Sequence, residues 1–267
     1  MGSVEEHERE VAGLGVRWLS APGPDPPVLY LHGVPTSGED WRPFLERTGG
    51  IAPDLPGFGR SHKTTTFDYS IAGYDRFLEA FLDELGIERV RLVVHDWGAV
   101  GLAFAQRAPA RVERLVVVSA VPLLPGYRWH RVARWWRRPV LGELAMGATT
   151  RRGLRLLSRR GSPPPFPPEL VERAWRDFDQ GTQRAILRLY RSAPPDVLAS
   201  AGRDLGRVAA PALVVWGEHD PYIPARFADA YAAALPDARA HRVAGAGHWP
   251  WLDRPEVLDL IARHLDD

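Results

Sequence analysis

The chain has 267 residues, a length that favours one α/β domain with at most one inserted subdomain. Its formal net charge of +1 gives no electrostatic case for a nucleic-acid partner, and its lack of cysteine excludes disulfides, a thiol nucleophile and thiolate metal sites. The polar N-terminus has none of the basic and apolar regions of a signal peptide, and there is no run of about 18 apolar residues to span a membrane, so we expect a cytoplasmic protein.

Short apolar runs alternate with segments of helical spacing over most of the chain. Strands are predicted, in chain order, at residues 4–21 (two strands around Ala12-Gly13), 28–31, 51–52, 92–94, 115–118, 212–216 and 240–243, and those at 28–31, 92–94, 115–118 and 212–216 are clear apolar runs. The helical spacing predicts helices at 38–48, 70–85, from the residues after 96 to about 108, and at 224–235 and 254–264. Strands that alternate with helices in this way are typical of a doubly wound, mostly parallel sheet.

The alternation stops in an Arg-, Trp- and Pro-rich region at 122–207, where the sequence carries only helical patches. We expect this region to form an inserted helical cap. The predicted domain organisation is a core made of residues 1–121 and 208–267, with the cap between its two parts. The Trp, Leu and Pro content of the cap favours an apolar pocket.

The segment Leu92–Ala99 carries the strongest functional signal. Its apolar run ends at a polar residue, and small residues lead on into a helix, which is the form of a nucleophile elbow. Ser is the commonest residue at the centre of this turn, but here it is Asp96. A carboxylate at this place attacks a saturated carbon and becomes an ester itself. The alternative is that Asp96 only caps the following helix.

Three other polar motifs follow predicted strands. They are His32-Gly33-Val34-Pro35, Trp216-Gly217-Glu218-His219-Asp220 and Gly245-Ala246-Gly247-His248-Trp249-Pro250. Ligands of such sheets bind beyond the carboxyl ends of the strands, so these motifs are expected to meet Asp96 there. The chain order is nucleophile, acid, histidine, as in the α/β-hydrolase triad.

Because of these four motifs and their order, the chain from residue 28 onward resembles an α/β-hydrolase of the branch that includes epoxide hydrolases and haloalkane dehalogenases. The resemblance implies the α/β-hydrolase fold, with the predicted cap inserted into it. It implies that Asp96 is the nucleophile, that His248 activates the water that hydrolyses the ester, and that Asp220 orients the imidazole. Neither a metal ion nor an organic cofactor is expected.

The resemblance also implies which groups stabilise developing charge. The backbone N–H groups of Val34 and Trp97 are expected to form the oxyanion hole. For an epoxide, family members use cap tyrosines as leaving-group donors. Tyr190, in Leu189-Tyr190-Arg191, matches one of them, and Tyr127 is the only candidate for the second, since 141–145 contains none.

For a haloalkane, two N–H donors are needed, and the side chain of Trp97 is the first. The usual second donor is an Asn after His-Gly, where Val34 stands, or a cap Trp. We therefore favour an epoxide hydrolase acting on a small to medium apolar epoxide, with haloalkane dehalogenase as the alternative. A small-ligand binding protein of low turnover, or an esterase or lactonase, is a further alternative on the same fold.

The expected partners are a small apolar substrate and water, with no nucleic acid and no membrane, in a monomer or homodimer. The basic run Arg128–Arg138, with three tryptophans, leaves a membrane-surface helix as an alternative. We favour a cap helix whose Trp side lines the pocket and whose Arg side faces water.

Overall fold

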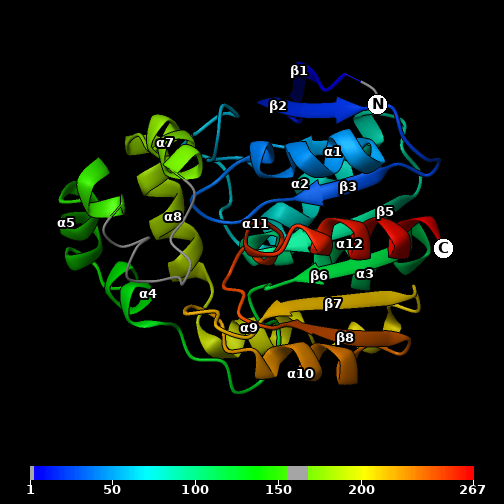
Figure 1. Cartoon of the computed structure of the whole chain (residues 1–267). Helices are drawn as coiled ribbons and strands as arrows, with labels where there is room; N and C mark the ends of the chain where they lie inside the picture. The colour runs from blue at the N-terminus through cyan, green and yellow to red at the C-terminus, as the bar shows by residue number, and fades with distance from the viewer. Residues whose placement is uncertain (1–2, 156–167) are drawn as a thin grey trace.

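A computed structural model describes residues 3–155 and 168–267, and it places eight strands of these residues in one sheet (Figure 1). The strand order is β1-β2-β4-β3-β5-β6-β7-β8. In chain order the strands are β1 (Glu5–Val11), β2 (Leu14–Ala21), β3 (Val28–Leu31), β4 (Gly50–Pro53), β5 (Val90–His95), β6 (Val112–Val118), β7 (Ala212–Gly217) and β8 (Ala238–Val243). Only β2 pairs antiparallel with its neighbours, and the other pairs are parallel. The predicted mostly parallel sheet is confirmed.

Helices cover both faces of the sheet because its central strands are apolar on both sides. Within β5, Leu92 and Val94 pack in the same cluster as α2, α3 and α10, whereas Val93 packs in the cluster of α1 and α12. The helices of the core are α1 (Arg42–Thr48), α2 (Ile71–Glu84), α3 (Gly101–Arg107), α9 (Pro195–Ala201), α10 (Arg226–Ala234), α11 (Pro250–Asp253) and α12 (Glu256–Asp266). Short 3₁₀ turns are η1 (Gly38–Trp41), η2 (Asp96–Val100), η3 (Pro109–Arg111) and η4 (Leu205–Arg207).

A group of helices among the described residues lies together beyond the carboxyl ends of the parallel strands, on the side away from both termini (Figure 1). They are α4 (Arg131–Trp136), α5 (Leu141–Gly147), α7 (Pro168–Asp177) and α8 (Gln180–Ser192), and we call them the cap helices. They fall within the predicted cap, although α9 of the same region lies with the core (Figure 1) and η4 contacts α3. The exact boundaries 122–207 stay a prediction. In the described part of the chain, no helix is both long and apolar enough to cross a bilayer.

Two details differ from the sequence prediction. The segment after Asp96 begins as the 3₁₀ turn η2 before α3, and the helix expected over 38–48 is split into η1 and α1. The break in the second case falls where Pro43 occupies the first turn of α1, a position that needs no backbone N–H donor.

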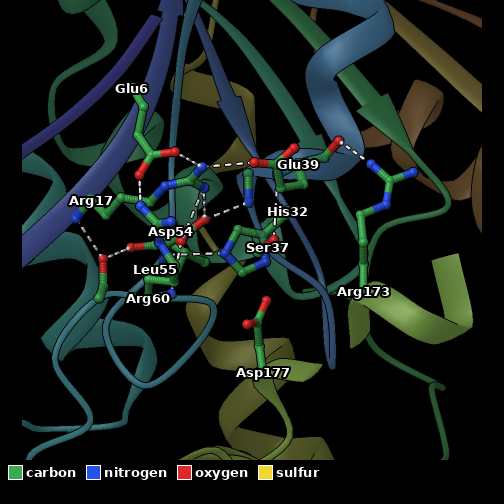
Figure 2. A network of polar contacts seen from close by, with 12 residues as sticks. Glu6, Arg17, His32, Ser37, Glu39, Asp54, Leu55, Arg60, Arg173 and Asp177 are labelled. Atoms are coloured by element: carbon green, nitrogen blue, oxygen red, sulfur yellow. Dashed lines mark hydrogen bonds and ion pairs between the residues drawn. The ribbon is translucent and has the colours of Figure 1, made fainter. Parts of the chain in front are cut away.

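A buried polar network ties the loops after β3 and β4 to the sheet (Figure 2). Arg17 of β2 is 3% exposed and Asp54, directly after β4, is fully buried, with 3.4 Å between Nη1 and Oδ2. Arg17 also donates to Glu6 and Glu39 at 2.9 and 2.7 Å. The carboxylate of Asp54 accepts two backbone N–H groups, from the start of η1 and from Arg60. This arrangement fixes the loop that precedes η1.

Candidate active site

Asp96 stands at a sharp turn between β5 and η2. Its φ is 49°, a left-handed conformation that is uncommon for residues other than glycine, and it is 6% exposed. Such backbone strain is often found at functional sites. The loop after β3 approaches so closely that a Cβ on Gly33 would lie 2.4 Å from the Cβ of Asp96. Glycine is therefore required at residue 33.

The three polar residues predicted from separate strand ends meet around His248. Its Nδ1 is 2.7 Å from Oδ2 of Asp220, and its Nε2 is 3.5 Å from Oδ2 of Asp96. The other oxygen of Asp220 accepts backbone N–H groups from Tyr222 and Ile223 at 2.8 and 2.9 Å. Asp220 thus has a fixed orientation, and it fixes the imidazole in turn.

Asp96, Asp220 and His248 lie close enough for their charges to shift the pKa values of Asp96 and His248. Burial alone would lower the pKa of His248, but the carboxylates of Asp220 and Asp96 raise it to about 10. Burial would likewise raise the pKa of Asp96, but His248 and the N–H of Val34 hold it below its usual range. At neutral pH Asp96 is a carboxylate and His248 is an imidazolium.

The predicted oxyanion donors lie on either side of Asp96. The backbone N–H of Val34 donates to Oδ1 of Asp96 at 2.8 Å. Trp97 is at the first turn of η2, where backbone N–H groups have no acceptor within the helix. Both groups belong to the loops that flank the carboxylate.

Two buried histidines hold these loops in place. His32 donates from Nδ1 to the carbonyl of Gly33 and accepts the N–H of Leu55 at Nε2, at 2.7 and 2.9 Å (Figure 2). His95 hydrogen-bonds through Nε2 to the backbone carbonyl of His248 at 2.9 Å. Burial lowers the pKa of His32 to about 4 and that of His95 to about 3, so both stay neutral.

A cavity of about 460 Å³ opens above Asp96 and His248. Its wall is mostly apolar and is shared between the strand ends and the cap helices. Besides Asp96 and His248, the residues described there are Val34, Pro35, Tyr127, Trp129, His130, Val132, Trp136, Ala145, Thr149, Leu154, Phe178, Ile186, Tyr190, Tyr222, Ile223 and Trp249. A site of this kind suits a small apolar ligand.

Both tyrosines predicted as leaving-group donors line this cavity. Tyr190 lies on α8, and burial, followed by the charge of Asp96, raises its pKa well above the usual value. Burial also raises the pKa of Tyr127, whose hydroxyl has no hydrogen-bond partner among the described residues. The two phenols therefore keep their protons and can donate them.

The structure places Trp97 differently from the other predicted donors. Its ring stacks on Trp129 at 5.3 Å and meets Tyr190 edge-on at 5.1 Å. It is not among the described residues that line the cavity. Trp129 also uses its own N–H, which donates to the carbonyl of Ala193 at 2.9 Å. Of these two indoles, Trp129 is thus engaged, whereas Nε1 of Trp97 has no hydrogen-bond acceptor among the described residues.

Two cavity residues, Tyr222 and His130, were not predicted. Tyr222 meets the ring of His248 edge-on at 5.2 Å, and burial raises its pKa to about 12. His130 accepts the N–H of Ala133 at Nδ1, and burial lowers its pKa to about 4, so the neutral ring carries its proton on Nε2. The only sequence signal for Tyr222 is its place two residues after Asp220, and for His130 its place before a helix.

Within the described residues, no group of three His, Asp or Glu side chains is arranged to hold a metal ion. The expectation of a site without cofactors stays a prediction.

The α/β hydrolase fold family model matches residues 26–255. The chain belongs to the α/β-hydrolase family. This hydrolase is 32% identical to a haloalkane dehalogenase of Mycolicibacterium paratuberculosis, over 95% of this chain and 88% of that protein. Its fold is similar to that of haloalkane dehalogenase DbeA from Bradyrhizobium elkani, with a TM-score of 0.83 and 25% identity over 99% of this chain and 98% of that one. It is also similar to the epoxide hydrolase CorEH, with a TM-score of 0.84 and 22% identity over 99% of each chain, a likeness of fold alone.

Proposed function

We propose that this hydrolase opens small to medium apolar epoxides through a covalent ester on Asp96. The observation that carries the proposal is that two protonated phenols, Tyr127 and Tyr190, line the same cavity as Asp96 and His248. Opening an epoxide leaves an alkoxide on the product, and this oxygen needs a proton donor as the C–O bond breaks.

In the first step, the carboxylate of Asp96 attacks a ring carbon of the epoxide. The C–O bond breaks, its electron pair goes to oxygen, and a phenol of Tyr190 or Tyr127 donates the proton. Asp96 then becomes a neutral ester, so one of the two charges that hold the proton on His248 is lost. The tyrosinate takes up the proton that His248 gives up, which restores the phenol and leaves His248 neutral.

In the second step, the neutral His248 takes a proton from water, and the resulting hydroxide attacks the carboxyl carbon of the ester. The tetrahedral intermediate carries an oxyanion, which the backbone N–H groups of Val34 and Trp97 stabilise. As this intermediate collapses, the bond between the carboxyl carbon and the alkyl oxygen breaks. The leaving oxygen takes the proton of the carboxyl group, which releases the diol and restores the Asp96 carboxylate. Asp220 keeps the imidazole oriented throughout.

Haloalkane dehalogenation is the second candidate, because proteins with that name are 32% to 35% identical to this chain. It would use the same ester on Asp96, with the halide leaving toward Trp97. Because Val34 offers no side-chain hydrogen bond, the second N–H donor would be a cap tryptophan such as Trp136, which lines the cavity. Low-turnover binding and esterase or lactonase activity are further outcomes of the test below.

The test traps the ester by blocking its hydrolysis. His248→Gln removes the base, and this variant is incubated separately with styrene oxide and with 1-bromohexane before intact-mass measurement. An epoxide hydrolase gains the mass of the whole epoxide, whereas a dehalogenase gains the alkyl group in place of a proton. The double variant Asp96→Asn/His248→Gln is the control and gains neither mass.

A second arm of the test addresses the phenols. Adding Tyr190→Phe to His248→Gln is expected to slow epoxide adduct formation by roughly 100-fold, the usual contribution of a positioned proton donor. Adduct formation from 1-bromohexane does not need this proton and should be unaffected. Absence of both adducts in a folded variant would overturn the two candidates and favour low-turnover binding or esterase or lactonase activity.

A further inference from the structure

The outer surface of the cap helices carries an unusual apolar patch. Trp135 of α4, Val140 in the following turn and Leu144 of α5 are 56%, 67% and 63% exposed. They account for three of the four exposed large apolar side chains in the described residues, the fourth being Val197 at 38%. Val140 has a φ of 67°, a strained conformation for a β-branched residue.

The same surface is basic. Arg131, Arg134 and Arg138 are exposed and follow one another at spacings of three and four residues, so they share a side of the segment that contains Trp135. Within 128–155 the sequence has eight arginines and one acidic residue. That residue, Glu143, is engaged by Arg191 through both carboxylate oxygens, at 2.7 and 2.8 Å. Arg151 and Arg155 pair with Glu172, so the positive charge around the patch comes mainly from Arg131, Arg134 and Arg138.

We propose that this face, formed by Arg131, Arg134, Trp135, Arg138, Val140 and Leu144, docks on an anionic lipid surface. Arginine pairs with lipid phosphates, tryptophan favours the interface between headgroups and chains, and the two aliphatic side chains enter the acyl boundary. The proposal revises the expectation that the protein has no membrane partner, and it depends on no particular reaction at Asp96.

The other occupants fit this chemistry less well. A second copy of the chain, paired through the same face, would bring like charges together. A nucleic acid would engage the arginines but leave Val140 and Leu144 exposed to water. An acidic protein partner matches the charge, and a wild type that does not float with anionic vesicles would favour it over a lipid surface.

The docked orientation has a consequence for the cavity. The inner sides of the same helices line it, through Val132 and Trp136 of α4 and Ala145 of α5. A lipid surface against the outer side would lie one helix layer from the cavity. An apolar substrate that concentrates in the membrane would then be released close to the site.

The experiment is flotation of the purified full chain with vesicles of phosphatidylcholine, alone or mixed with phosphatidylglycerol. Wild type should float with the anionic vesicles and much less with the neutral ones. The variant Trp135→Ser/Val140→Ser/Leu144→Ser should lose at least about tenfold in partition coefficient. Replacing the three arginines by glutamine should lose roughly 100-fold. Val197→Ser, an exposed apolar residue on α9, is the matched control and should bind like wild type.

A wild type that stays with the soluble fraction would overturn the proposal, as would flotation that the apolar triple variant leaves unchanged. A change of the triple variant from dimer to monomer in light scattering, without lipid binding, would assign the face to a second copy. Hydrogen exchange of the wild type tests the docking without any variant, so the proposal can still be refuted if a variant fails to fold. Protection of 131–147 by anionic vesicles is expected, and its absence would count against docking.

Discussion

Removing the charge of Asp96 should lower the pKa of His248, because two carboxylates hold the proton on that ring. The distance from Nε2 to Oδ2 of Asp96 is 3.5 Å. At this separation unit charges attract by about 1 kcal/mol at the dielectric constant of water and by about 5 kcal/mol at an effective value of about 20. Because about 1.4 kcal/mol corresponds to one pKa unit, Asp96→Asn should lower the pKa of His248 from about 10 by roughly 1 to 3 pH units.

The assay is an NMR titration of ¹⁵N-histidine-labelled protein, with the His248 signal assigned by its loss in His248→Gln. His32 and His95 stay neutral over the neutral to alkaline range and do not interfere. Asp259→Asn, which changes an exposed carboxylate on α12, is the control and should leave the titration unchanged. An unchanged pKa in Asp96→Asn would refute the reasoning, since Asp220 alone would then hold the proton and ester formation could not convert His248 into a base.

Two further predictions test the contacts that hold the loops around Asp96 in place. Gly33→Ala places a Cβ within 2.4 Å of the Cβ of Asp96, so the rate of hydrolysis should fall by about 100-fold or more. The control is Gly147→Ala, where a Cβ meets nothing within 4 Å, and it should keep full activity in the same rate assay. Asp54→Asn leaves one of two backbone N–H groups without its acceptor and breaks a buried ion pair, so urea unfolding should show a loss of about 2–4 kcal/mol. Asp259→Asn, at a surface pair, should cost less than about 1 kcal/mol, and equal losses in the two variants would contradict the role of the network.

The sheet and the group around His248 were predictable because they follow from local patterns. The central strands are short apolar runs. Asp96 comes directly after β5, Asp220 lies in the turn after β7, and His248 lies in the loop after β8. Parallel strands end at one edge, so the sheet itself brings together residues that are more than 100 positions apart.

The buried contacts that hold the loops around His248 in place were not predictable in the same way. Arg17 and Asp54 are ordinary charged residues in the sequence, and only the pairing of β2 with β4 buries them together. His32 and His95 could be seen to flank the site, but their fixed neutral state depends on burial and on hydrogen bonds to Leu55 and to the backbone of His248. These contacts join residues far apart in the chain, so no local sequence pattern predicts them.

The choice of leaving group depends on the cap, where sequence patterns predict the structure least well. Tyr127 precedes α4 and Tyr190 lies on α8, so their common cavity results from how separate helices pack above the strand ends. The same packing places Trp97 behind Trp129 and Tyr190, although its position after the nucleophile is equally compatible with halide chemistry. Two enzymes could therefore share every residue of the sheet-derived site and differ in reaction through the cap alone. For this hydrolase, the phenols that face the cavity are the reason to test an epoxide first.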